Sequence, residues 1–167
     1  EDIVSHAKSL GHRVPLITNG FMLTRNYLKN NPGLWDLDSI RISLYGVDND
    51  STYFVTRHKD AFENVRKNII SFLNDRNEKK SNVKLGLNYI VIPENTDKLL
   101  SLIDYIKYIN DNVKNGKGVD FLTIREDFGS VTEISNQEDI KKVKNRKYVL
   151  EGLLKDDQRT NLIDIFR

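Results

Sequence analysis

Polar side chains alternate with apolar ones along four short stretches of this 167-residue chain. The stretches read VPLITNG, IRISLYG, VKLGLNYIVIPEN and VDFLTIRED, and each ends in a polar cluster. Hydroxyl, amide and guanidinium groups of this kind can bind a polar or anionic small molecule through hydrogen bonds. The polar positions within the stretches are Thr18, Arg41, Ser43, Asn88, Thr123 and Arg125.

Each stretch has the pattern of a β-strand, because successive side chains of a strand point to opposite faces. We expect strands at about 14–19, 39–45, 83–92 and 119–125, with helical patterns between them. Strands that alternate with helices favour a parallel sheet or barrel, in which the strand ends share one rim. The sequence therefore predicts an α/β fold, a partial (β/α) barrel of mainly parallel strands with outer helices.

The six polar residues would line the inner face of this barrel if the apolar faces of the strands meet the helices. A polar interior is unfavourable unless its groups bond to one another, to water or to a ligand. For any single residue, a hydrogen-bond network within the protein or an edge strand facing solvent is an equally good explanation. For the four strands together, we expect a cavity lined for a ligand.

Capping patterns predict where the helices begin. Thr24 precedes a short helix, and Asp60 with Glu63 has capping-box spacing ahead of a longer one. One of residues 95–97 is expected to cap a further helix. Residues 48–51 read as a polar loop.

Length, charge and cysteine content limit the function classes. The 167 residues are enough for one core, but a closed eight-stranded barrel needs about 250. A formal net charge of +2 gives no reason to expect a nucleic-acid or membrane partner. The chain has no cysteine, which excludes disulfides and thiolate metal sites and fits a reducing, cytoplasmic compartment.

The start of the chain has the pattern of a helix already under way. Residues 2–10 carry helically spaced apolar residues, and Gly11 is placed to end the helix. We therefore expect a fragment that lacks the preceding strands. Residues 1–135 are assigned to the partial barrel, and residues 136–167 to a C-terminal helical segment that could start a further element.

The order of these motifs resembles the middle of a radical S-adenosylmethionine (SAM) enzyme. ITNG at 17–20 resembles the TNG end of the family's third strand, and IRISLYG at 40–46 resembles the SLDG end of its fourth. LNYIVIPEN and FLTIRED resemble the fifth and sixth strands, so the resemblance covers roughly residues 1–127. A Y…R…F…V continuation of the family is matched by Tyr53, Arg57, Phe62 and Val65.

The resemblance implies an enzyme that uses a [4Fe–4S] cluster and SAM. In that family the cluster reduces SAM to a 5′-deoxyadenosyl radical, which abstracts hydrogen from the substrate, so no residue here need act as general acid or base. The family's CxxxCxxC loop and glycine-rich segment are absent, and both would lie before residue 1. The missing cysteines therefore indicate truncation, and the chain is not expected to be active alone.

The resemblance also implies which residues bind SAM. Thr18, Asn19 and Ser43 would contact SAM from the strand ends. Arg57 would pair with the SAM carboxylate, and Asn88 would lie beside its ribose and adenine. The first two residues could instead form only a turn, and Arg57 could be a surface charge near acidic neighbours.

Four further residues are implied at the mouth of the barrel, where a substrate would bind: Tyr45, Thr123, Arg125 and Glu126. Tyr45 stands where the family commonly has aspartate. Arg125 suggests an anionic group such as a phosphate or a nucleotide sugar, although Arg125 and Glu126 could be an ordinary ion pair. The substrate, small molecule or peptide, is not specified further, and an external electron donor is implied as a partner.

Two other function classes fit the same strand pattern. One is a non-catalytic α/β domain that binds a nucleotide-like or phosphorylated ligand at the same rim. The other is a small complete βα domain that acts as an interaction module. A CxxxCxxC motif upstream in the parent gene would favour the enzyme over both.

Overall fold

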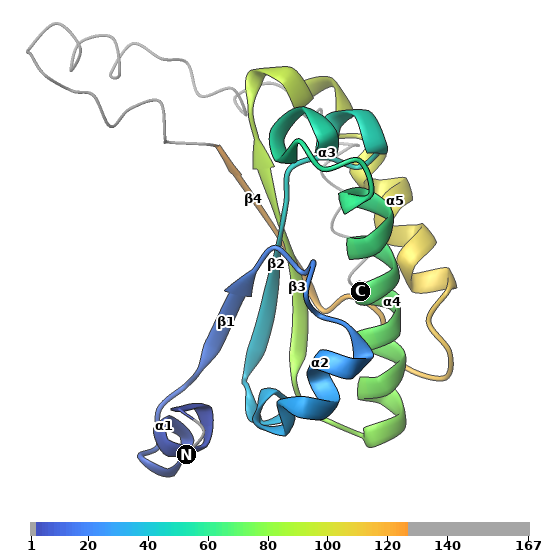
Figure 1. The fold of residues 1–167 in the computed structure, drawn as a ribbon. Coiled ribbons are helices and arrows are strands. Elements are labelled where there is room, and N and C mark those ends of the chain that lie inside the picture. Colours follow the sequence, from blue (N-terminus) through green and yellow to red (C-terminus); the bar gives the residue numbers. More distant parts are fainter. Residues whose placement is uncertain (1–2, 127–167) are drawn as a thin grey trace, which may run out of the picture.

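The structure is a computed structural model, and it describes residues 3–126. Helices and strands alternate along this part of the chain (Figure 1). The strands are β1 (Pro15–Thr18), β2 (Ser39–Leu44), β3 (Lys84–Val91) and β4 (Phe121–Glu126). The α-helices are α1 (Ile3–Ser9), α2 (Arg25–Asn30), α3 (Asn49–Thr56), α4 (Ala61–Lys79) and α5 (Ser101–Asp111), and the short 3-10 helices are η1 (Pro32–Asp36) and η2 (Pro93–Lys98).

The four strands form one sheet in the order β1-β2-β3-β4, and every neighbouring pair is parallel. Helices α2, α4 and α5 lie on the same side of this sheet (Figure 1). A doubly wound sheet reverses its strand order and carries helices on both faces, whereas a β/α barrel does neither. The predicted fold class is confirmed: the chain is α/β, with parallel strands and outer helices as in part of a β/α barrel.

The hydrophobic core lies between the sheet and the helices. Strands β2 and β3 contribute the fully buried side chains of Ile40, Ile42, Leu85 and Leu87. Helices α4 and α5 bring apolar residues at intervals of three and four to the same layer, because one face of each helix is apolar. These are Val65, Ile69, Phe72 and Leu73 from α4, and Leu102, Ile106 and Ile109 from α5.

The opposite face of the sheet has no covering helix among residues 3–126 (Figure 1). The register aligns three of its polar residues in a row across β2, β3 and β4. We call this set the polar row, and it consists of Ser43, Asn88 and Thr123. The alternation of polar and apolar residues predicted that all three share one face, and the strand register confirms this prediction.

The register corrects the predicted orientation of Thr18. Thr18 is aligned with Ile42, whose side chain is buried under the helices, so Thr18 faces the helices and not the open side. Ile17, which is 60% exposed, occupies the open-face position of β1. The prediction was wrong because Leu16 and Ile17 are both apolar, so the alternation in this strand does not fix which face is buried.

Helix α3 occupies part of the segment that was predicted to be a polar loop. It forms because the Asp48 carboxylate caps it, accepting a hydrogen bond from the backbone N–H of Ser51 at 2.8 Å. The expected cap within residues 95–97 is also wrong, since that segment belongs to η2 and the next helix begins at Ser101.

The predicted N-terminal cap is confirmed for α2 but not for α4. Thr24 caps α2 as predicted, its hydroxyl accepting a hydrogen bond from the N–H of Tyr27 at 3.2 Å. Asp60 precedes α4 but its side chain makes no capping bond. Glu63 instead accepts from Arg66 at 2.6 Å, so the capping-box prediction is wrong.

The predicted C-terminal segment, residues 136–167, lies outside the described residues, and the division at residue 135 stays a prediction. Within residues 3–126, no helix combines the length and the apolar character needed to cross a membrane.

Candidate functional site

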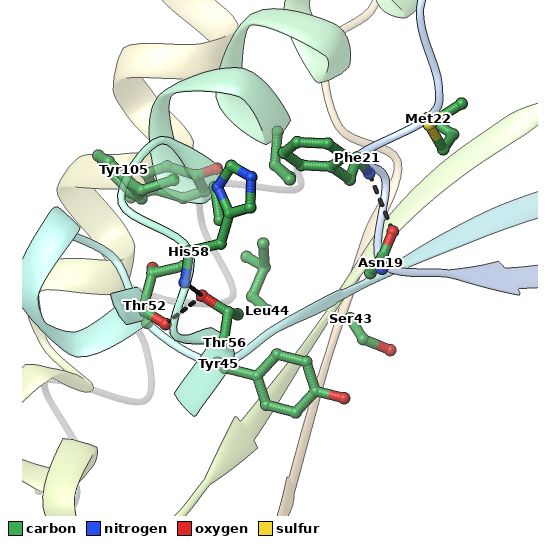
Figure 2. A pocket seen from close by; sticks show the side chains of 14 residues that line it. Asn19, Phe21, Met22, Ser43, Leu44, Tyr45, Thr52, Thr56, His58 and Tyr105 are labelled. Atoms are coloured by element: carbon green, nitrogen blue, oxygen red, sulfur yellow. Dashed lines mark hydrogen bonds between the residues drawn. The ribbon is translucent and has the colours of Figure 1, made fainter. Parts of the chain in front are cut away.

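A cavity of about 360 Å³ lies at the carboxyl ends of β1 and β2 (Figure 2). We call it the rim cavity. Its walls include Asn19 and Phe21 after β1, Ser43 and Tyr45 at the end of β2, and His58 before α4. Enzymes built on parallel β/α sheets bind their ligands at this end, because the loops that follow the strands meet there.

The turn after β1 is fixed in place by its own residues and by α4. Gly20 has a φ of +76°, and a Cβ there would lie 3.1 Å from a side-chain carbon of Ile42. The Asn19 side chain accepts a hydrogen bond from the N–H of Phe21 at 3.0 Å. Asn68 of α4 donates to the carbonyls of Gly20 and Phe21 at 3.1 and 2.8 Å. The cavity wall formed by this turn is therefore held rigidly.

The polar row contains a buried amide oxygen without a donor. Asn88 is only 3% exposed, and no described residue hydrogen-bonds to its Oδ1. Its neighbours in the row, Ser43 and Thr123, are half-buried. A buried oxygen left unpaired costs about 1–3 kcal/mol. A donor from a ligand or from water at this face would remove that cost.

The ends of β2 and β3 are joined by the buried side chain of Asn95, which was not among the predicted site residues. Its Oδ1 accepts from the N–H of Ile92 at 2.9 Å, and its Nδ2 donates to the carbonyls of Tyr45 and Ile90 at 3.0 and 2.9 Å. The hydroxyl of Tyr89 donates to the Asn95 carbonyl at 3.2 Å, and burial raises the pKa of Tyr89 to about 12. Asn95 thereby fixes the backbone of Tyr45 at the rim.

The structure brings together five of the predicted site residues. Asn19, Ser43 and Tyr45 line the rim cavity. Ser43 also begins the polar row, which continues through Asn88 and Thr123. The cavity and the row are therefore adjacent parts of one region.

The other predicted site residues lie apart from this region or at its border. Thr18 ends β1 on the helix side, where its Oγ1 accepts from the Gly20 N–H at 3.2 Å. Arg57 is exposed at the end of α3, and its guanidinium carbon lies 5.3 Å from the centre of the Phe54 ring. Arg125 is exposed, and Glu126 is the last residue of β4. The roles predicted for all nine residues stay predictions.

Comparison with known proteins finds a relative that is an enzyme. The chain is 41% identical over 126 residues to dTDP-4-amino-4,6-dideoxy-D-glucose ammonia-lyase from Streptomyces venezuelae. The matched segment is 75% of this chain, and the chain spans about a quarter (26%) of the length of that relative. No protein-family model matches the chain.

Several residues that line the rim cavity were not identified from the sequence. They include His58 and Tyr105, whereas Phe62 was noted only as part of the Y…R…F…V resemblance. Tyr105 lies three residues after Leu102 and four before Ile109, so its position in the apolar stripe of α5 was a usable signal that it is buried. His58 carried no such signal, because the loop that holds it has no periodic pattern.

Proposed function

We propose that this chain is the SAM-binding part of a radical SAM enzyme whose substrate is a nucleotide sugar. The observation that carries the proposal is the unpaired, buried Oδ1 of Asn88 in the polar row. The two motifs that resemble the family, at 17–20 and 40–46, run into the turn and the strand end that border this region. The 41% identity to an ammonia-lyase supports an enzyme.

The donors and acceptors of the polar row suit SAM. Asn88 Oδ1 needs an N–H donor, which the adenine amino group provides, and the hydroxyl of Ser43 can bond to a ribose hydroxyl. Thr18 faces the helices, where its Oγ1 accepts from the Gly20 N–H, so no contact with SAM is proposed for its side chain. Arg57 would reach the SAM carboxylate by turning away from Phe54.

The residues present do not fit the iron–sulfur cluster. Its ligands are cysteine thiolates, and the chain has no cysteine. Within residues 3–126, no three His, Asp or Glu side chains gather where they could hold a metal ion. We propose that the cluster is held by residues outside this chain. When bound, SAM and the cluster supply the radical that abstracts hydrogen from the substrate, while this chain binds and orients SAM.

The substrate class is proposed from the relative and from the sequence. The relative is named for a dTDP-linked amino sugar, and Arg125 at the carboxyl end of β4 suits an anionic group such as its diphosphate. Tyr45, Thr123 and Glu126 are proposed to contact the substrate. The same proposal includes an external electron donor, a cytoplasmic location, and residues 1–135 as the partial-barrel portion.

Two serines on the same face of β2 provide the test. Ser43 lies in the polar row, whereas Ser39 lies four residues earlier at the amino end of the strand. The full-length gene product would be reconstituted anaerobically with iron and sulfide, reduced, and assayed for 5′-deoxyadenosine formed from SAM. We expect the wild type to form it, Ser43→Ala to raise the KM for SAM about fivefold, and Ser39→Ala to match the wild type.

Two results would count against the proposal. The first is a gene product that forms no 5′-deoxyadenosine and whose gene encodes no CxxxCxxC motif within about 100 residues upstream of this chain. That distance is sufficient because the two βα units that would precede this chain in a barrel need about 60 residues. Equal KM values for Ser43→Ala and Ser39→Ala would instead remove the assignment of the polar row to SAM.

A further inference from the structure

The hydroxyl of Tyr105 is buried at the rim cavity without a hydrogen-bond partner among the described residues. The residue is 5% exposed and lies on the inner side of α5. Figure 2 shows its oxygen on the side of His58, across the cavity from Ser43 and Tyr45. A buried hydroxyl without a partner is unfavourable, so the position favours a ligand that offers an acceptor.

The side chains that line the cavity near this hydroxyl are mainly aromatic and apolar, and the nearby Glu63–Arg66 ion pair lies outside the lining. The rings of Phe62 and Tyr105 lie 5.6 Å apart, and Phe21 meets His58 edge to face at 4.9 Å. No Asp, Glu, Lys or Arg is among the described residues that line the cavity. A phosphate or carboxylate would be poorly stabilised in such a site, because a charge away from water needs a charged partner. The cavity therefore suits a neutral ring.

We propose that the rim cavity holds the thymine base of a nucleotide sugar, with the Tyr105 hydroxyl donating to a ring carbonyl. This inference rests on the proposed function, which supplies the substrate class. Thymine offers carbonyl acceptors and one methyl group, whereas adenine has no carbonyl. Bases also stack on aromatic side chains such as those of Phe21 and Phe62.

The position of the cavity agrees with this assignment. Ser43 lines the rim cavity and also begins the polar row. A base in the cavity would therefore leave the sugar and its diphosphate near the row where SAM is proposed to bind. The charged diphosphate would lie outside the mainly aromatic and apolar lining, where water and Arg125 can reach it.

The matched variants are Tyr105→Phe and Tyr108→Phe. Both residues lie on α5, and Tyr108 is 45% exposed, so the second substitution removes a hydroxyl at the surface. Binding of dTDP-glucose and ADP-glucose to the full-length gene product would be measured by calorimetry, and the Tm of each variant would be recorded. We expect Tyr105→Phe to weaken dTDP-glucose binding about fivefold while Tyr108→Phe does not. We expect ADP-glucose to bind weakly to all three proteins.

The Tm separates a ligand contact from a structural one. Because no described residue bonds to the Tyr105 hydroxyl, its removal should leave the Tm unchanged or raise it. A lower Tm for Tyr105→Phe than for Tyr108→Phe would show a structural partner and overturn the inference. So would equal dTDP-glucose affinity in the two variants, or tighter binding of ADP-glucose than of dTDP-glucose.

The SAM assay on the same proteins distinguishes this inference from the proposed function. Tyr105-dependent binding of dTDP-glucose without any formation of 5′-deoxyadenosine would leave the thymine site in place and reject the radical SAM activity. Formation of 5′-deoxyadenosine with no effect of Tyr105→Phe on nucleotide binding would reject the thymine site alone.

Discussion

Arg76 shows how one residue can fix the position of a strand. Its side chain is 4% exposed, and it donates to the Asp120 carboxylate and to the carbonyls of Lys117 and Gly118 just before β4. Asp120 also accepts from the N–H of Leu85 at 2.7 Å, so the same carboxylate holds β3. A buried charge is tolerated only when it is paired and hydrogen-bonded. Arg76 therefore joins α4 to the start of β4.

Replacing this arginine should be strongly destabilising. We expect Arg76→Met to lower the free energy of unfolding by about 3 kcal/mol, because Asp120 loses its charged partner. Arg66→Met on the same helix is the control, since the Arg66–Glu63 pair is partly exposed and is worth about 1 kcal/mol or less. Urea unfolding followed by circular dichroism measures both. Similar losses in the two variants would contradict the structural role of Arg76.

At the scale of elements, the pairing of β3 with β4 depends on a glycine. A Cβ at Gly86 would overlap the ring of Phe121, which lies beside it in the register. The guanidinium of Arg41 lies 5.5 Å from the centre of that ring, so β2, β3 and β4 are connected on the open face. Glycine within a strand commonly marks such a close approach.

A double-mutant cycle tests this arrangement. We expect Gly86→Ala to lower the free energy of unfolding by about 2 kcal/mol through overpacking. In the presence of Phe121→Ala the same substitution should cost much less, because the ring that it meets is gone. Chemical unfolding of the single and double variants measures the coupling. Strictly additive effects would show that the ring is not what excludes a side chain at Gly86.

The start of α3 gives a pH-dependent contribution to stability. Burial opposes the charged form of Asp48, but hydrogen bonds from Ser51 and Lys98 outweigh it and lower the pKa of the carboxyl. The Ser51 N–H and the Lys98 amine lie 2.8 and 3.2 Å from its oxygens. A lowered pKa means that this stabilisation is present above the unfolded-state pKa, near 3.9, and is lost as the pH falls through the folded-state value.

We therefore expect the effect of Asp48→Ala to depend on pH. At about pH 7 the substitution should cost about 1 kcal/mol of unfolding free energy, the usual value for a lost N-cap. At about pH 3 the cost should be smaller, because below the unfolded-state pKa the unfolded carboxyl binds protons more readily than the folded one, which reduces the stabilisation that Asp48 provides. Asp48→Asn retains an oxygen acceptor and should lose less at about pH 7. A cost for Asp48→Ala that is the same at both pH values would contradict the lowered pKa.

At the scale of the whole molecule, residues 3–126 form a sheet that is covered by helices on one face and open on the other (Figure 1). The polar row lies on the open face, and the rim cavity adjoins it at the carboxyl ends of β1 and β2. The glycine-rich segment of the radical SAM resemblance is absent from the 167 residues. Under the proposed function, this chain supplies part of the SAM contacts.

The 167-residue chain by itself should thus bind SAM weakly, with a Kd above about 100 µM. Fewer contacts leave less binding free energy to offset the loss of translational and rotational freedom. Calorimetry with the isolated chain and with the full-length gene product measures the difference. Tight binding by the isolated chain that survives Ser43→Ala would contradict the assignment of the polar row.

The sequence by itself determined the elements that can be recognised from neighbouring residues. The alternation in IRISLYG and FLTIRED placed Ser43 and Thr123 on one face of their strands, and the register agrees. Thr24 correctly predicted the start of α2, and Gly11 correctly predicted the end of α1. Both signals can be read from the sequence because a capping side chain and a left-handed glycine contact only the adjoining turn of the helix. Such patterns are local, so they can be read without knowing what packs against them.

Only the tertiary structure decided which of these residues meet. It turned Thr18 toward the helices, placed Arg57 against Phe54, and brought Tyr105 of α5 to a cavity formed after β1 and β2. It also revealed Asn95 and Arg76 as buried connections between distant segments. These arrangements depend on strand register and on long-range packing. Both are set by the free energy of the whole fold. No local pattern of residues reports that free energy.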